Sequence, residues 1–295
     1  MSRGRGGRRH AGWILVLPLL ISACDSLYLR GFFHSRSDPD GRFEESRTLP
    51  MHSDTDSLEH PFQVDGEYVY SFPVVSDIHL SGGVSDVLTL FIAEELLPDD
   101  LFILDCGDST QSGRESDFTA YRGIMEEGGK PFFQSIGNHD TFYDGWSHYK
   151  ALLGKSVYTL EVGGAGMPGS LLLICLDSAG STLGRKQIRW LEECLEEERD
   201  RRDHCIVFTH CNVFPLNLTS ADQFSDKEEI YRLMNLFEQH DVDLVLMGHD
   251  HQWNRRQFNG VEYLNLEPLK YGSGDTSCLR VRVRGRDLTL ERVPF

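Results

Sequence analysis

The feature that most constrains the fold is a regular alternation of short apolar runs and helical patterns, which begins near Tyr68. Apolar runs typical of strands cover residues 68–76, 101–106 and 132–136, and helical patterns cover residues 84–97 and 117–127. A β-α-β-α-β series of this kind places its strands parallel in one sheet, with helices packed against it. We therefore expect an α/β fold built on a largely parallel sheet.

The second half of the chain repeats this theme with more strands. Strands are predicted over residues 157–162, 171–176, 204–209 and 244–247, and helices over residues 185–198 and 227–240. In the tail, short strands break at Asn259-Gly260 and at residues 284–287, both of which are typical hairpin turns. The sequence contains no evident internal repeat, so we expect one domain over residues 68–295.

The first 23 residues are typical of an export signal. A basic start is followed by an apolar run over residues 13–21, and the small residues Ser22 and Ala23 stand directly before Cys24. The run is shorter than the roughly 20 residues that a membrane-spanning helix needs. Residues 21–24 resemble the bacterial lipoprotein processing box, which implies a lipid on Cys24 and a domain held at the cell membrane, outside the cytoplasm. The alternative is an ordinary secretory signal that happens to contain a cysteine.

Residues 24–67 are rich in Ser, Asp, Arg, His and Gly and contain few apolar runs. Such a composition buries too little apolar surface to form a stable core of its own. We expect this segment to be a lipidated N-terminus followed by a tether or a loosely packed extension.

Six cysteines follow Cys24, and several of them stand within apolar runs that look like buried strands. We expect most of them to be buried thiols rather than disulfides. Because no CxxC pair is present, zinc bound through thiolates is not expected.

Acidic residues outnumber basic ones 46 to 29, which gives a formal net charge of −17. General nucleic-acid binders need positive charge to displace counterions from phosphates. A nucleic-acid partner is therefore not expected. A phosphate-containing substrate would have to be attracted by local positive charge, such as bound divalent cations.

Five apolar strands are each followed at once by residues that can bind a metal ion. These residues are Asp77, His79, Asp108, Asn138, His210, His249 and His251. The carboxyl ends of parallel strands lie along one edge of a sheet, where ligand sites form. We therefore expect the seven side chains to converge, although they are far apart in the sequence.

The residue types suit a site for two divalent metal ions. A carboxylate such as Asp108 can give one oxygen to each ion, and imidazoles and amide oxygens suit Zn²⁺, Mn²⁺ or Fe²⁺. A water between two such ions becomes hydroxide near neutral pH and can attack phosphorus in line. His139 can then give a proton to the leaving oxygen, and we expect the neighbouring Asp140 to set the tautomer of its imidazole.

In their order, these motifs resemble those of the calcineurin-like metallophosphoesterases. The matching residues are Asp77-Ile78-His79, Gly107-Asp108, Gly137-Asn138-His139-Asp140, His210 and Gly248-His249-Asp250-His251. Each motif alone is short enough to arise by chance, whereas all five in order, each after an apolar strand, are much more specific. The resemblance covers about residues 74–293.

The resemblance implies a four-layer αββα sandwich of two mixed β-sheets flanked by helices. It further implies that one metal is held by Asp77, His79 and His251, that the other is held by Asn138, His210 and His249, and that Asp108 bridges them. His139 would then face the substrate. Leu176-Asp177-Ser178, followed by Gln187, is similar to the family's middle strand and helix.

Three functions are compatible with these motifs. The first is hydrolysis of a small phosphomonoester or phosphodiester, as in the compact members of the family. The second is an extracytoplasmic nuclease, which the acidic composition disfavours. The third is a surface lipoprotein that binds metal without catalysis, which the presence of all seven ligands disfavours. Ser109, Thr110 and Gln111 follow the Gly-Asp pair, where purple acid phosphatases carry a tyrosine ligand, so an Fe³⁺ site of that kind is not expected.

Overall fold

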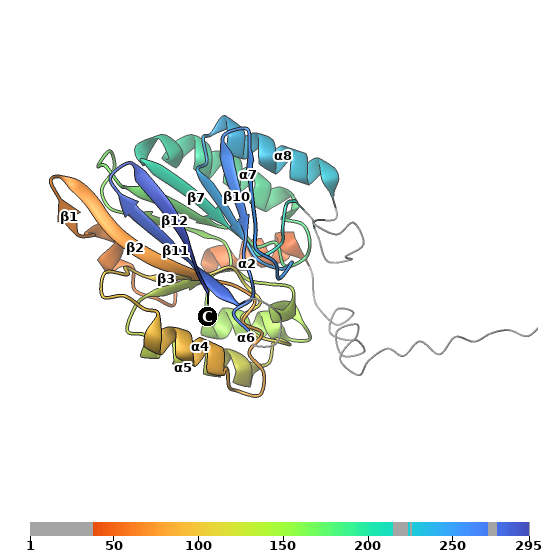
Figure 1. Ribbon diagram of the computed structural model, residues 1–295. Helices are drawn as coiled ribbons and strands as arrows, with labels where there is room; N and C mark the ends of the chain where they lie inside the picture. The colour runs from red at the N-terminus through yellow and green to blue at the C-terminus, as the bar shows by residue number, and fades with distance from the viewer. Residues whose placement is uncertain (1–37, 215–223, 225, 271–275, 295) are drawn as a thin grey trace, which may run out of the picture.

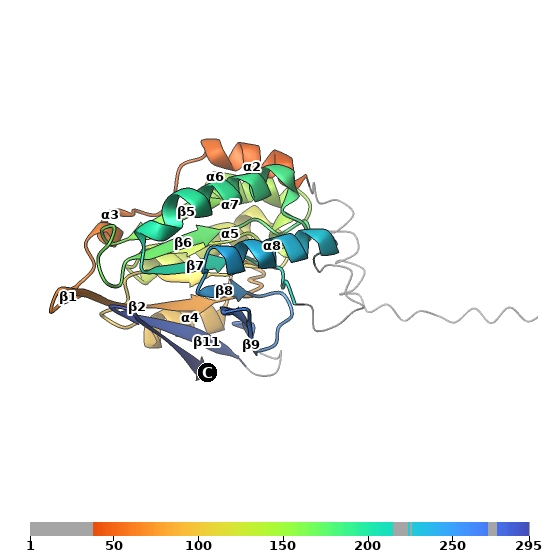
Figure 2. The same cartoon turned by 90° about the horizontal axis from the view of Figure 1, so that it is seen from above.

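Two β-sheets pack face to face, and helices cover the outer face of each sheet (Figures 1 and 2). The computed structural model describes residues 38–214, 224, 226–270 and 276–294. Both sheets mix parallel and antiparallel strands. The architecture is thus the four-layer αββα sandwich that the family resemblance implies.

The first sheet contains the predicted β-α-β-α-β series. Its strands are β1 (Gln63–Val64), β2 (Glu67–Val75), β3 (Ile103–Asp105), β4 (Phe132–Gln134), β11 (Ser277–Arg284) and β12 (Asp287–Pro294). The order across the sheet is β12-β11-β2-β3-β4, and β1 pairs with the start of β2. Strands β2, β3 and β4 are parallel, whereas β11 is antiparallel to both β2 and β12. The β11–β12 hairpin turns where residues 284–287 predict it.

The second sheet has a parallel centre and antiparallel edges. Its strands are β5 (Tyr158–Val162), β6 (Leu171–Cys175), β7 (His204–Phe208), β8 (Leu244–Met247), β9 (Asn254–Phe258) and β10 (Val261–Asn265). The order across the sheet is β5-β6-β7-β8-β10-β9. Strands β6, β7, β8 and β10 are parallel, so their carboxyl ends reach the same edge.

The helices divide between the two outer layers. Those over the first sheet are α4 (Asp86–Glu94), α5 (Glu115–Glu127) and α6 (Gly145–Leu152), and those over the second are α7 (Gly184–Glu198) and α8 (Lys227–Gln239). Short 3-10 turns are η1 (His139–Thr141) and η2 (Arg199–Arg201). Side-chain oxygens of Ser85 and Asp226 accept N–H groups of the first turns of α4 and α8, which fixes where these helices begin. Among the described residues, no helix is long and apolar enough to cross a membrane.

Alternate residues of the central strands face different layers of the core. On β6, Leu173 packs between the two sheets, whereas Leu172 packs toward α7 and α8. Between the sheets, the rings of Phe72 and Phe102 stack at 4.5 Å. Burial on both faces explains why these strands are continuous apolar runs in the sequence. The six cysteines after Cys24 are buried and form no disulfide, as predicted.

The segment 38–67 packs against the domain, which corrects the prediction of a loose tether through residue 67. It forms α2 (Pro39–Thr48) and α3 (Asp56–Glu59), in addition to β1. In α2, Arg42, Phe43 and Ser46 are buried. The segment escapes prediction because two of these three are polar and find their partners on distant loops, which no apolar periodicity reveals. Residues 1–37, with the predicted signal and Cys24, lie outside the described residues.

Candidate metal centre

The seven predicted metal ligands come together at one edge of the two sheets. Asp77 and His79 follow β2, Asp108 follows β3, Asn138 follows β4, His210 follows β7, and His249 and His251 follow β8. Main-chain hydrogen bonds join these loops: the Asp77 N–H donates to the Gly107 carbonyl at 2.9 Å, and the Gly248 N–H donates to the His210 carbonyl at 3.0 Å. The edge predicted from the strand pattern is therefore where the side chains meet.

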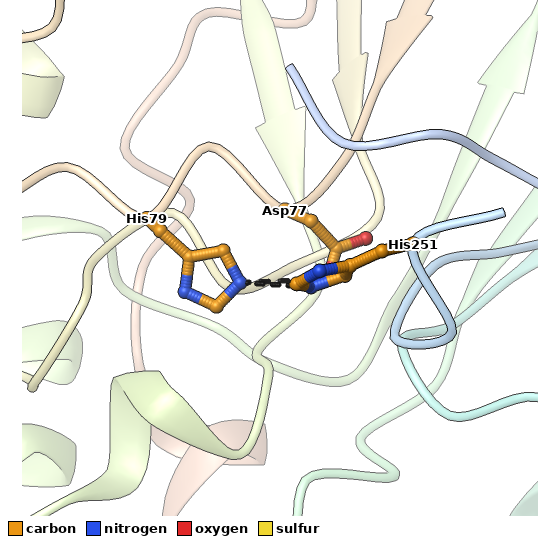
Figure 3. A group of neighbouring side chains, drawn as sticks. All are labelled: Asp77, His79 and His251. Atoms are coloured by element: carbon orange, nitrogen blue, oxygen red, sulfur yellow. Dashed lines mark hydrogen bonds and ion pairs between the residues drawn. The ribbon is translucent and has the colours of Figure 1, made fainter. Parts of the chain in front are cut away.

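Asp77, His79 and His251 form one half of the cluster (Figure 3). Nε2 of His79 lies 3.0 Å from Nε2 of His251, which in turn lies 3.2 Å from Oδ1 of Asp77. Asp77 and His79 are buried, whereas the His251 side chain is 38% exposed. Solvent therefore reaches this half from the side of His251.

Asn138, His210 and His249 form the other half. Oδ1 of Asn138 lies 3.0 Å from Nε2 of His210 and 3.1 Å from Nδ1 of His249. The two imidazole nitrogens are 3.2 Å apart. One oxygen and two nitrogens thus converge on a single point.

Asp108 stands between the two halves. Its Oδ2 lies 3.3 Å from Nε2 of His210 and 3.7 Å from Nε2 of His79. Its Oδ1 accepts a hydrogen bond from the His139 N–H at 2.8 Å. One carboxylate oxygen is therefore within reach of histidines from both halves, as a bridging ligand requires.

Five of the seven residues have a left-handed backbone conformation. Their φ angles are 53° for Asp77, 49° for His79, 56° for Asp108, 73° for His249 and 53° for His251. Residues other than glycine adopt this conformation rarely, and it persists only where the surroundings hold it. The fold thus accepts backbone strain to aim these side chains at one another.

His210 is oriented by the neighbouring loop. Its Nδ1 lies 3.0 Å from the Cys106 carbonyl oxygen, which accepts the Nδ1–H, so Nε2 faces Asp108 and Asn138. Although burial disfavours the charged ring, the Asp108 carboxylate outweighs it and raises the pKa of His210 to about 10. The centre therefore favours a positive charge at this position.

His79, His249 and Asp108 favour their deprotonated forms, whereas hydrogen bonding to Asp77 outweighs burial and raises the pKa of His251. Burial lowers the pKa of His79 to about 3, despite the nearby Asp108 carboxylate. Burial also lowers the pKa of His249. For Asp108, burial favours the neutral acid, but His210 and His139 hold the pKa of its carboxyl well below the usual range. Neutral imidazoles and ionised carboxylates are the forms that bind metal ions.

His139 adjoins the metal centre. Its ring centroid lies 4.6 Å from that of His79, and one of its ring nitrogens lies within 4.8 Å of a ring nitrogen of His79 and of a carboxylate oxygen of Asp108. Its Nδ1 lies 2.8 Å from the Gln111 carbonyl oxygen, which accepts the Nδ1–H. Nε2 is then the nitrogen that can exchange a proton with a bound molecule.

The structure corrects the role predicted for Asp140. Its carboxylate accepts hydrogen bonds from the N–H groups of Gly137, Ser109 and Thr110 and from the Thr110 hydroxyl, at 2.9 to 3.3 Å. The Gln111 carbonyl engages the imidazole of His139 in its place. Burial, together with repulsion from Asp108, raises the pKa of Asp140 to about 7. Asp140 thus ties the loop after β3 to the loop after β4.

The family is decided by the chain's match to a family model. The model for calcineurin-like phosphoesterases matches residues 71–253. The chain belongs to this family. The matched span contains every predicted metal ligand and leaves α2 outside it. Comparison with curated proteins gives no match.

Solved structures share the calcineurin-like phosphoesterase fold at low sequence identity. A dimetal phosphatase from Danio rerio is 13% identical with a TM-score of 0.53, over 77% of this chain and 99% of that chain. A purple acid phosphatase from yellow lupin is 14% identical with a TM-score of 0.62, over 79% and 52%. GAP50, described as the anchor in the inner membrane complex of Plasmodium, is 15% identical with a TM-score of 0.55, over 77% and 89%. At these identities the likeness concerns the fold alone.

In this member of the family, the donor set fits divalent metal ions. Imidazole nitrogens of His79 and His251 face each other at 3.0 Å, and those of His210 and His249 at 3.2 Å. Nitrogen lone pairs and carboxylate oxygens that converge in this way are mutually stabilised by a cation between them. The residues are also of the types that borderline divalent ions prefer.

Two buried polar residues that support the site were missed in the sequence. The Ser76 hydroxyl donates to Oδ2 of Asp77 at 2.6 Å. Asp105 accepts from the Gly107 N–H, the Ser109 hydroxyl and the Tyr121 hydroxyl. Both stand at the ends of apolar runs, where a buried polar side chain signals an internal partner. The Gln111 carbonyl had no such signal, because it acts through the main chain.

Proposed function

We propose that this protein is a dimetal-dependent phosphoesterase that hydrolyses a small phosphomonoester or phosphodiester. The proposal rests on the position of Asp108 between the two halves. Its Oδ2 lies 3.3 Å from Nε2 of His210 and 3.7 Å from Nε2 of His79. A carboxylate shared by two sets of nitrogen and oxygen donors is what two neighbouring divalent ions require. Membership of the calcineurin-like phosphoesterase family supports the reaction class.

The two halves of the cluster divide the ligands. Asp77, His79 and His251 would hold one ion, Asn138, His210 and His249 would hold the other, and Asp108 would serve both. Two bound ions of Mn, Fe or Zn would neutralise the phosphoryl oxygens and activate a water for attack on phosphorus. The His210 ring, held by the Cys106 carbonyl, presents Nε2 to this chemistry without reorientation.

His139 would act as the general acid. The Gln111 carbonyl accepts its Nδ1–H at 2.8 Å, and the Phe142 ring packs 4.6 Å from the imidazole, so the ring plane is held. As the bond from phosphorus to the leaving oxygen breaks, the proton on Nε2 passes to that oxygen. The imidazole becomes neutral and regains a proton from solvent.

We also propose that the protein is exported and lipid-anchored through Cys24. Support comes from the basic start, the short apolar run and the Ile21-Ser22-Ala23-Cys24 stretch of the sequence. The substrate would then be met outside the cytoplasm. Incorporation of a labelled fatty acid into the wild-type chain, and its loss in Cys24→Ser, tests the anchor. Labelling of both chains or of neither would contradict it.

The proposed activity is tested on residues 25–295, purified without chelator. Metal content is measured by elemental analysis, and hydrolysis is measured with p-nitrophenyl phosphate and bis-p-nitrophenyl phosphate. We expect about two metals per chain and turnover that Asp108→Asn lacks. The ratio of the two rates separates monoesterase from diesterase. A folded protein that neither binds Mn²⁺, Zn²⁺ or Fe²⁺ nor turns over either substrate would overturn the proposal.

A second candidate is a metal-binding protein that uses the same scaffold for attachment to a partner. One observation favours it. GAP50 of Plasmodium, whose structure is similar to this one over 89% of the GAP50 chain, is described as the anchor in a membrane complex. Bound metal without hydrolysis of either ester would support this candidate. Salt-dependent binding and cleavage of DNA would instead support a nuclease, which the net charge of −17 disfavours.

A further inference from the structure

Arg42 brings a buried charge from the N-terminal segment to the edge of the second sheet. It lies on α2, outside the span that matches the family model. Its Nε donates to Oδ2 of Asp177 at 2.8 Å, and a terminal nitrogen donates to Oδ1 at 2.9 Å. The side chains are 2% and 0% exposed, respectively. A bidentate ion pair of this kind fixes the position of the carboxylate and also neutralises its charge.

Asp177 belongs to the loop that follows β6, and its other contacts fix that loop. Its carboxylate also accepts from the Ser156 hydroxyl and from the Ala179 N–H, both at 3.2 Å. Its own N–H donates to the Gln187 side-chain oxygen at 2.8 Å. Removing one member of a buried ion pair leaves the charge of the other uncompensated. Without Arg42, the buried Asp177 carboxylate would lose its cation, and we expect the loop that carries it to shift.

Residues 176–178 in turn hold the chain on both sides of His210. The Thr209 hydroxyl donates to the Leu176 carbonyl at 3.0 Å and lies 2.7 Å from the Ser178 hydroxyl, from which it can accept a hydrogen bond. On the other side, the Cys211 N–H donates to the Ser178 hydroxyl at 2.8 Å. His210 therefore sits between two residues that are fastened to the loop that carries Asp177.

We propose that Arg42 is a positioning residue for the half of the metal centre formed by Asn138, His210 and His249. It acts through Asp177 and the loop of residues 176–178. Helix α2 would thus support the metal centre, although it lies outside the span that matches the family model. This inference rests on the proposed dimetal function and deepens it. Partners that orient metal ligands typically change metal affinity by about 10 to 100-fold when they are removed.

The test compares Arg42→Met with a control on the same helix. Phe43 is also buried, and its ring lies 6.1 Å from that of Trp190 on α7. Phe43→Ala should loosen α2 through lost apolar packing, without removing the ion pair to Asp177. Arg42→Lys keeps the positive charge but cannot form the bidentate pair with Asp177. This variant still tests the proposal if Arg42→Met does not fold.

The first readout is titration of the metal-free proteins, residues 25–295, with Mn²⁺ in a calorimeter. His79→Ala and His210→Ala identify which binding step belongs to which half. We expect Arg42→Met to weaken the His210 step by about 10 to 100-fold, with a smaller loss in Arg42→Lys, and to change the other step by less than about threefold. Equal weakening of both steps, no weakening, or the same pattern in Phe43→Ala would overturn the proposal.

The second readout needs no metal and separates this inference from the proposed function. In the metal-free proteins, amide hydrogen exchange at residues 209–211 should be faster in Arg42→Met than in Phe43→Ala. If the wild-type protein binds none of Mn²⁺, Zn²⁺ and Fe²⁺, the dimetal function fails while this comparison still decides whether Arg42 positions His210. Equal exchange rates in the two variants would overturn the role of Arg42.

Discussion

A β-carbon on Gly137 would lie 2.0 Å from Oδ1 of Asp108, so the loop before Asn138 and the central carboxylate fit only because residue 137 has no side chain. Gly137→Ala must therefore displace Asp108 or the loop that carries Asn138 and His139. We expect a loss of at least about 100-fold in phosphoesterase turnover, because displacements near 1 Å have effects of this size at catalytic centres. Steady-state kinetics and elemental analysis check this.

Gly123 provides the matched control for Gly137. It lies within α5, and a β-carbon there would meet nothing within 4 Å. Gly123→Ala should keep full activity and increase the free energy of unfolding by about 0.5–1 kcal/mol, since alanine is the better helix former. Full activity and metal content in Gly137→Ala would contradict the close fit.

The parallel arrangement of the central strands and the convergence of the seven predicted ligands could be predicted because both follow from one regularity. Each apolar run, such as residues 101–106, is buried on both faces, and its polar residues come at its carboxyl end. In parallel strands those ends share an edge, so spacing along the chain does not matter. His210 could be assigned to the site because it directly follows an apolar run, although it is not part of a longer motif.

The supporting contacts could not be predicted in the same way. Arg42 stands in a polar segment, and its partner Asp177 is 135 residues away, so only the folded chain brings them together. The orientation of His139 depends on the main-chain carbonyl of Gln111, which any residue could supply. Proximity in sequence was misleading for Asp140, because its carboxylate turns toward the loop after β3.

Variants of His139 should separate proton donation from metal binding. His139→Ala removes the proposed acid but none of the seven ligands. We expect its rate to fall by about 100-fold or more on a phenyl or alkyl phosphate, and much less on p-nitrophenyl phosphate, whose leaving group needs no proton. Rates on the two esters, with metal content, check this. Equal losses on both esters, or loss of metal, would count against the acid role.

Asp140→Asn should behave differently from His139→Ala. The amide cannot accept all the hydrogen bonds that Gly137, Ser109 and Thr110 donate to the carboxylate, and its own N–H groups would face donors. We expect the free energy of unfolding to fall by about 2–3 kcal/mol and turnover to fall to a similar extent on good and poor leaving groups. Urea unfolding and the same two esters test this. A loss confined to the poor leaving group would restore Asp140 as the partner of His139.

His52 makes the stability of the protein depend on pH in a window that its burial defines. Its ring packs against Phe132 with centroids 4.5 Å apart, and burial lowers its pKa from 6.5 to about 4. The unfolded chain thus binds a proton more readily than the folded one between these values. The contribution of His52 to stability is complete above pH 6.5 and is lost as pH falls toward 4. Between pH 7 and 4.5 the loss should be about 2–3 kcal/mol.

Because carboxylates also titrate between these pH values, the measurement is the difference in the free energy of urea unfolding between wild type and His52→Phe at pH 7 and at pH 4.5. The phenyl ring keeps the packing on Phe132 and cannot bind a proton, so the variant should lose less stability on acidification. Identical losses in the two proteins would show that His52 is protonated in the folded state without cost.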